Sequence, residues 1–238
     1  MNSKKNRVAI LQCGDVLDKF QSEFSNYPEM VIKFLSNKFV GYHFDVFDLQ
    51  KQCYPDNLSH YDLYVITGSK NSVYENEIWI KKAIGYVQTL AKGKNKIAGI
   101  CFGHQLIAMA LKGRVEKSGK GWGVGVAVNR VLHKTKWMKS AKHSLNILVS
   151  HQDQVTALPE GADILIESTF CPFFMVQWRE NILSIQGHPE WVKGYSAALM
   201  EERRGIIPDQ TINAGLASLS IPTDNELVAE WFYDFMLT

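Results

Sequence analysis

Cys101 stands at the centre of a Gly-x-Cys-x-Gly pattern, Gly99-Ile100-Cys101-Phe102-Gly103, where an apolar strand gives way to a helix. This pattern is typical of a nucleophile elbow, a tight strand-to-helix turn whose flanking glycines avoid Cβ clashes with the backbone. The start of a helix also favours a thiolate, because the positive end of the helix dipole lies there. We therefore predict that Cys101 is a nucleophile; the alternative is a buried core cysteine beside two packing glycines.

A base for this thiol stands in the segment Gly187-His188-Pro189-Glu190, at the end of another apolar strand. Pro189 favours extended backbone at His188. Residues i and i+2 of an extended segment point the same way, so Glu190 can hold one ring nitrogen of His188 while the other nitrogen faces the thiol. The segment therefore predicts a general base with an orienting carboxylate, and the alternative is a surface turn.

Alternating strands and helices in the first half of the chain can position these groups. The apolar pattern predicts strands at residues 7–11, 42–49, 61–67 and 97–100, and helices at 29–37, 77–91 and 103–112. Repeated strand-helix-strand order indicates a parallel sheet with helices on both faces. Active sites of such sheets gather at the carboxyl ends of the strands, which is where Cys101 and His188 stand.

The rest of the chain has a different pattern. Residues 119–125 are glycine-rich, and closely spaced strands are expected at 124–132, 145–149, 164–167, 174–178 and 182–185. This spacing favours an added antiparallel portion. A helix at 194–204, a stretch with Gly and Pro at 205–222 and a final helix at 224–236 follow. We expect a single domain over residues 1–238, because no repeat or linker interrupts the chain.

Composition excludes several classes of protein. The chain has 26 Lys and Arg against 24 Asp and Glu, a formal charge of +2, with 46% hydrophobic residues, which is ordinary for a globular protein and gives no general reason to bind nucleic acid. No apolar run approaches the roughly 18 residues of a membrane-spanning helix, and the N-terminus lacks the apolar segment of a signal peptide. We expect a soluble, cytoplasmic protein without nucleic-acid or membrane partners.

The elbow followed by His-Pro-Glu resembles the class I glutamine amidotransferase family, whose triad is Cys-His-Glu. Carried over by motif, Cys101 is the nucleophile, His188 the base and Glu190 its orienter. The turn at Gly68 takes the place of the family's glycine turn, so the resemblance assigns the oxyanion hole to the backbone N–H groups of Gly68 and Phe102. The implied fold is α/β, a three-layer flavodoxin-like sandwich with a mainly parallel central sheet, the nucleophile elbow and the antiparallel addition.

The same resemblance names substrate-binding residues. The segment Ser150-His151-Gln152-Asp153-Gln154-Val155 is similar to the family's Ser-His-x-Asp-x-Val loop beside the glutamine pocket, and Gln105 matches the glutamine after the elbow. The implied substrate-binding residues are Gln105, Ser150, His151, Gln152 and Asp153. Three further dipeptides, Gly68-Ser69, Trp79-Ile80 and Gly121-Trp122, are similar to the free-standing branch near GMP-synthase-like proteins and γ-glutamyl peptidases.

One departure from the family bears on specificity. The residue before the catalytic histidine is often aromatic in the family but is Gly187 here. We expect Gly187 to open the pocket on the leaving-group side, which would admit a bulkier amine than ammonia.

Other candidates receive weaker roles. We expect His104 to pack or to support the elbow, Cys13, Cys53 and Cys171 to be structural free thiols, and no metal site, because no third ligand stands at a suitable spacing from His151 and Asp153. The basic stretch around Trp137 contains Lys134, Lys136, Lys139 and Lys142. It is either a docking surface for an acidic partner or a solvated insertion.

Three functions remain open. The first is hydrolysis of the γ-glutamyl amide of glutamine, without a cofactor, through a cysteine thioester. The second is a γ-glutamyl peptidase acting on γ-glutamyl peptides or glutathione-like conjugates, and the third is a non-catalytic regulatory glutamine-binding module. The chain shows no P-loop for ATP, so ammonia use would require a synthetase or acceptor-enzyme subunit as partner, and direct hydrolysis would require none.

Overall fold

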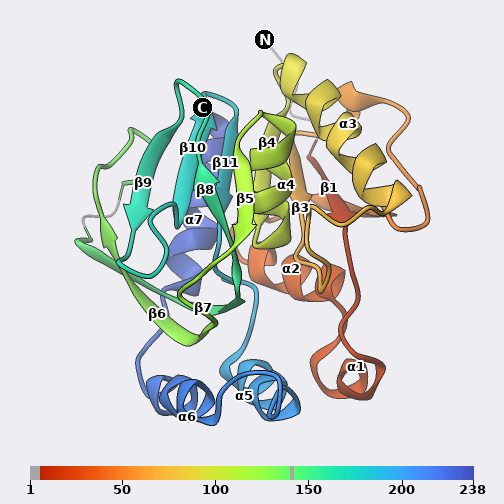
Figure 1. Ribbon diagram of the computed structural model, residues 1–238. Helices are drawn as coiled ribbons and strands as arrows, with labels where there is room; N and C mark the ends of the chain where they lie inside the picture. The colour runs from red at the N-terminus through yellow and green to blue at the C-terminus, as the bar shows by residue number, and fades with distance from the viewer. Residues whose placement is uncertain (1–5, 140–141) are drawn as a thin grey trace.

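The computed structural model describes residues 6–139 and 142–238, and these form an α/β sandwich with helices on both faces of a central sheet (Figure 1). The strands are β1 (Arg7–Gln12), β2 (His43–Asp48), β3 (Leu63–Ile66), β4 (Lys96–Ile100), β5 (Arg114–Lys117), β6 (Gly123–Val131), β7 (Ser144–His151), β8 (Asp153–Ala157), β9 (Asp163–Glu167), β10 (Met175–Arg179) and β11 (Ile182–Ile185). The α-helices are α1 (Asp18–Phe24), α2 (Tyr27–Ser36), α3 (Ile78–Lys92), α4 (Phe102–Ala110), α5 (Lys193–Glu202), α6 (Asp209–Ser218) and α7 (Asn225–Leu237). A 3₁₀ turn covers Leu58–His60.

Within the described residues, the main sheet has nine strands in the order β2-β1-β3-β4-β11-β10-β9-β6-β7. The pairs from β2 to β11 are parallel, and those from β11 to β7 are antiparallel. The predicted parallel sheet with an antiparallel addition is confirmed. Strands β5 and β8 form a separate two-stranded antiparallel sheet.

Alternation along β1 divides the core into two layers. Val8 and Ile10 pack in a cluster with α2 and α7, whereas Ala9 and Leu11 pack in a second cluster with α3 and α4. All four side chains are fully buried, so β1 has apolar residues on both faces, as a central parallel strand requires.

The sheet brings the two chemically important segments together. β4 and β11 are adjacent and parallel, with Ile100 opposite Ile185. Cys101 therefore follows one strand at the same edge of the sheet where residues 186–190 follow the other. The helices α1 and α5, which come after β1 and β11, lie beyond this carboxyl edge together with α6 (Figure 1).

No helix among the described residues is long and apolar enough to cross a bilayer.

Candidate active site

Cys101 has the strained backbone of a nucleophile elbow. Its φ of 51° and ψ of −101° lie outside the usual regions for a residue with a Cβ, and its N–H donates to Ile185 O at 2.9 Å. Two glycines permit the turn: a Cβ on Gly99 would lie 2.6 Å from Gly103 O, and a Cβ on Gly103 would lie 2.4 Å from Ile66 O. The strain therefore holds the thiol at the start of α4, and neighbouring elements pack too closely for either glycine to be replaced.

This packing predicts a stability effect at the elbow. We expect Gly103→Ala to lower the free energy of unfolding by about 2 kcal/mol or more, because its Cβ would press on the backbone of β3. Gly85→Ala is the matched control, since Gly85 lies inside α3 with no atom within 4 Å of an added Cβ. That control should stabilise the protein by up to about 1 kcal/mol. Urea unfolding of both variants measures the difference, and an unchanged midpoint for Gly103→Ala would contradict this account.

His188 and Glu190 form a buried pair next to Cys101. His188 Nδ1 lies 2.8 Å from Glu190 Oε1, and the two side chains are 3% and 1% exposed. The ring of Trp191 stacks on the His188 ring with centroids 3.6 Å apart and an interplanar angle of 12°. The carboxylate and the indole together fix the orientation of the imidazole.

The charge of His188 follows from its surroundings. Burial lowers its pKa, but the charges of Cys101 and Glu190 and the hydrogen bonds to both outweigh burial and raise the pKa to about 10. His188 is therefore an imidazolium at neutral pH. Its positive charge lies directly beside Cys101.

Gln186 is a site residue that the sequence reasoning missed. Its side chain is fully buried, and its Nε2 lies 3.5 Å from Cys101 Sγ. Gln105 Nε2 donates to Gln186 Oε1 at 3.1 Å and to Asp153 O at 3.0 Å, which turns the Gln186 amide N–H toward the thiol. The signal was present in the sequence, because Gln186 stands two residues before His188 at the end of the same strand.

Gly68 lies against His188 and Cys101. A Cβ added to Gly68 would be 3.0 Å from His188 Cε1 and 3.9 Å from Cys101 Cβ, so the turn after β3 passes directly over the site. Phe102 is the first residue of α4, and the first N–H groups of a helix have no partner within the helix. Both backbone groups assigned to the oxyanion hole therefore stand near Cys101.

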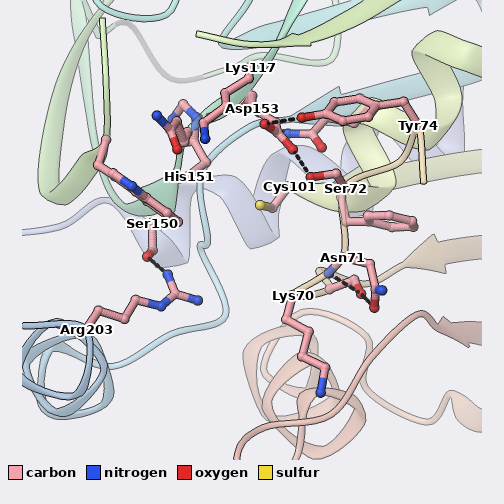
Figure 2. Close-up of a pocket in the computed structure, with 15 residues that line it drawn as sticks. Lys70, Asn71, Ser72, Tyr74, Cys101, Lys117, Ser150, His151, Asp153 and Arg203 are labelled. Carbon is pink, nitrogen blue, oxygen red and sulfur yellow. Dashed lines mark hydrogen bonds between the residues drawn. The ribbon is translucent and has the colours of Figure 1, made fainter. Parts of the chain in front are cut away.

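A cavity of about 260 Å³ opens on Cys101 (Figure 2). It is lined by Ser69, Lys70, Asn71, Ser72, Tyr74, Cys101, Phe102, Gln105, Lys117, Trp122, Ser150, His151, Gln152, Asp153 and Arg203. All five residues expected to bind substrate are among them. Gly68, His188 and Glu190 are not part of this lining.

Three of the expected substrate-binding residues lie on strands and not in a loop. Ser150 and His151 end β7, and Asp153 begins β8. The Asp153 carboxylate accepts hydrogen bonds from Ser72 Oγ and from Tyr74 OH, the latter at 2.9 Å. Two strands and a carboxylate held by two hydroxyls make this wall rigid.

His151 is an uncharged member of the same wall. Burial lowers its pKa to about 4, and its Nδ1 lies 3.1 Å from Asp153 O. His151 is therefore neutral at physiological pH and offers a hydrogen-bonding nitrogen to the cavity without adding charge.

The expectation that Gly187 opens the pocket is wrong. A Cβ at Gly187 would lie 2.6 Å from Ile147 Cγ2 and 2.8 Å from Phe174 Cζ. These atoms belong to the core of the antiparallel portion, so Gly187 permits close packing there and does not face the cavity. An aromatic residue at this position would disrupt the core, and Gly187 has no part in choosing the leaving group.

His104, Cys13 and Cys171 are buried within the fold. His104 is fully buried with its Nδ1 2.7 Å from Ser184 Oγ, and burial lowers its pKa to about 3, as expected for a packed, neutral ring. The four cysteines are free thiols; Cys13 and Cys171 are buried, but Cys53 is exposed, so its expected structural role is not supported. Among the described residues, no cluster of three His, Cys, Asp or Glu side chains could hold a metal ion.

The basic stretch packs on the C-terminal helix. Trp137 is buried against Phe235, with ring centroids 5.6 Å apart. Lys139 forms an ion pair with Asp234 at 2.6 Å, and Lys142 pairs with Asp224. Lys134 and Lys136 are exposed. Two of the four lysines expected to form a docking surface are thus already paired with carboxylates of this chain.

The fold and the elbow define the class of protein: an α/β protein with a cysteine at a strand-to-helix turn and a histidine and a carboxylate just after the neighbouring strand. The family model for class-I glutamine amidotransferases matches residues 25–204, and the chain belongs to this family. The expected resemblance is therefore confirmed.

Individual relatives agree with this assignment. The chain is 31% identical over 175 residues to gamma-glutamyl peptidase 4 of Arabidopsis thaliana, covering 71% of this chain and 69% of the relative. It is 28% identical over 244 residues to a glutamine amidotransferase-like protein of Schizosaccharomyces pombe, covering 97% of this chain and 98% of the relative. The crystal structure of a glutamine amidotransferase from Thermotoga maritima has the same fold, with a TM-score of 0.74, 19% identity, and 97% and 96% of the two chains covered.

Proposed function

We propose that this protein hydrolyses the γ-glutamyl amide of glutamine through a thioester on Cys101. The observation that carries the proposal is the elbow cysteine beside the buried His188–Glu190 pair, open to a cavity on its other side. The strained elbow presents the thiol, and the raised pKa of His188 keeps a positive charge next to it. This arrangement is a nucleophile with a base and an orienting group.

In the first half of the reaction, the Cys101 thiolate attacks the γ-carbonyl carbon and forms the C–S bond. The carbonyl electrons move to oxygen, and the N–H groups of Gly68 and Phe102 stabilise this oxyanion. The oxyanion then collapses, the C–N bond breaks, and His188 gives its proton to the departing amine. The products of this half are a γ-glutamyl thioester and ammonia.

In the second half, water attacks the thioester carbonyl, and the now neutral His188 takes the proton of that water. Collapse of the second oxyanion breaks the C–S bond, which releases glutamate and restores the thiolate and the imidazolium. Gln186 stabilises the thiolate at both ends of the cycle, because its Nε2 is 3.5 Å from Sγ. Glu190 holds the imidazolium without exchanging the proton.

Cleavage of γ-glutamyl peptides is the second candidate. The cavity volume of about 260 Å³ and its continuation beyond Trp122 leave space for a leaving group larger than ammonia. A relative named gamma-glutamyl peptidase 4 covers 71% of this chain. The same nucleophile and base serve both reactions, because the γ-glutamyl part is common to both substrates.

The test is a substrate panel with the purified protein. We expect glutamate to be released from glutamine or from γ-glutamyl dipeptides, with the amine product in equal amount. α-Glutamyl dipeptides are the control and should remain intact, because the scissile carbonyl is then at the wrong carbon. Free ammonia from glutamine with this chain alone would support direct hydrolysis over transfer to a partner synthetase. Absence of all turnover, with glutamine bound, would favour the regulatory module and overturn the proposal.

A further inference from the structure

The positively charged residues that line the Cys101 cavity outnumber the negatively charged ones. Lys70, Lys117 and Arg203 line it against a single carboxylate, that of Asp153. Among residues 6–139 and 142–238, no carboxylate forms an ion pair with any of these three cations. Glutamine carries one positive and one negative charge, so it would not neutralise this excess.

Asp153 and Arg203 lie on different sides of Cys101, while Lys117 stands opposite Asp153 across the β5–β8 pair (Figure 2). Figure 2 shows Ser72 and Tyr74, which hold Asp153, on one side of the cysteine, and Ser150 with Arg203 on the other. The α-ammonium group that every γ-glutamyl compound carries would be attracted to the Asp153 side. The scissile bond then lies over Cys101, and the leaving amine extends toward Arg203.

Arg203 is held in a fixed position at the end of α5. Its Nη1 donates to Ser150 Oγ at 2.6 Å, and its guanidinium carbon lies 5.3 Å from the centroid of the Trp122 ring. The guanidinium has further N–H groups for a planar, bidentate contact with a carboxylate. The half-buried, pre-oriented side chain is better suited to binding an anion than a freely moving lysine.

The active cavity continues beyond Trp122. A neighbouring cavity of about 520 Å³ shares Lys117, Trp122 and Gln152 with it and reaches Ile206 and Pro208. Lys117 thus lies where the two cavities meet. A leaving group longer than ammonia would pass between Lys117 and Arg203, over the indole of Trp122.

We propose that Arg203 forms a leaving-group subsite for a carboxylate, so that the preferred substrates are γ-glutamyl amino acids or peptides whose amine portion carries a free carboxylate. The subsite rests on the γ-glutamyl hydrolysis proposed above, and it deepens that proposal by naming the substrate class. The carboxylate of the leaving amino acid contacts the Arg203 guanidinium, and its side chain lies along Trp122.

The test compares two substrates of nearly equal size, γ-glutamylglycine and γ-glutamylethylamide, which differ by the carboxylate on the leaving group. We expect Arg203→Gln to lower kcat/KM for γ-glutamylglycine by roughly 10- to 100-fold, as is usual for a lost hydrogen bond to a charged group. The same variant should change kcat/KM for γ-glutamylethylamide much less. Arg203→Lys should recover part of the loss, because it keeps the charge and loses the planar contact.

Lys94→Gln is the matched control. Lys94 is exposed in the turn between α3 and β4, away from the residues that line the cavity, and loses the same charge. The Lys94→Gln variant should leave kcat/KM unchanged for both substrates. If Arg203→Gln lowers kcat/KM equally for both substrates, the guanidinium binds the α-carboxylate that they share, and the leaving-group subsite is overturned.

A binding measurement separates this inference from the proposed activity. Cys101→Ala should bind γ-glutamylglycine more tightly than γ-glutamylethylamide in calorimetry, with the difference removed by Arg203→Gln in the same background. If the wild type turns over neither compound but this difference is observed, the proposed hydrolysis fails and the subsite stands. If the two compounds bind equally well, the subsite is overturned whatever the activity.

Discussion

Replacing Cys101 with alanine should lower kcat for γ-glutamyl hydrolysis by about 10⁴-fold or more, because the thioester can no longer form. The fold should remain intact, since alanine fits in the space of the cysteine. Circular dichroism and the urea midpoint check the fold, while the release of glutamate measures turnover. Cys101→Ser should be similarly inactive, because a hydroxyl is far less acidic than a thiol.

Chemical labelling tests the same assignment without relying on turnover. A chloroketone or diazo analogue of glutamine should modify Cys101 alone at neutral pH. Burial raises the pKa of Cys13, and it raises the pKa of Cys171 to about 12, so both remain unreactive thiols. Cys53 is exposed and serves as the internal control for non-specific alkylation. Mass spectrometry that finds equal labelling at Cys53 and Cys101 would contradict the assignment of the nucleophile.

The parallel half of the fold could be predicted from local sequence. Apolar runs such as residues 7–11 and 97–100 are short and buried on both faces, and turn residues separate them from amphipathic helices. These signals do not depend on distant contacts. The expected strand at 97–100 therefore agrees with β4 to one residue, and the helix expected at 77–91 agrees with α3 to one residue at each end.

Elements with weak local signals were missed. The short strand β5, with sequence Arg-Val-Glu-Lys, has one buried residue, Val115, and is stabilised by pairing with β8. The helix α6 lies in the stretch with Gly and Pro and packs on β6, where a Cβ on Gly125 would be 2.4 Å from Gly215 O. Tertiary contacts decide these elements, and a single sequence does not reveal such contacts.

The site divides in the same way. The residues of the elbow stand within a few positions of one another in the sequence, and so do those of the His-Pro-Glu segment. Both motifs could therefore be recognised from the sequence. Arg203 could not be recognised, because it reaches Ser150 from a helix more than fifty positions along the chain, and its hydrogen bond exists only in the folded protein. Gly187 faces Ile147 and Phe174 of the core, and the sequence does not reveal these contacts. The role expected for Gly187 in opening the pocket was therefore wrong.

The relative effects of His188 and Glu190 test the roles given to them. His188→Ala should lower kcat by about 10⁴-fold, because the leaving amine and the attacking water both lose their proton partner. Glu190→Gln should cost less, roughly 10²- to 10³-fold, because the amide can still contact the ring and Trp191 continues to stack on it. A smaller loss of this kind would identify Glu190 as a positioning residue. If Glu190→Gln abolishes turnover while His188→Ala leaves it nearly normal, the two roles are wrong.

The titration of His188 gives a readout that a purely structural role for Glu190 would not move. The negative charges of Cys101 and Glu190 raise the His188 pKa to about 10 against the opposing effect of burial. Removing the carboxylate charge in Glu190→Gln removes one of these two contributions, so the pKa should fall and the imidazolium should lose its proton at a lower pH. NMR of the ring nitrogens measures this shift directly. An unchanged His188 titration in a folded Glu190→Gln protein would show that the carboxylate does not stabilise the charged ring, and that the pair at 2.8 Å has no electrostatic part in keeping Cys101 reactive.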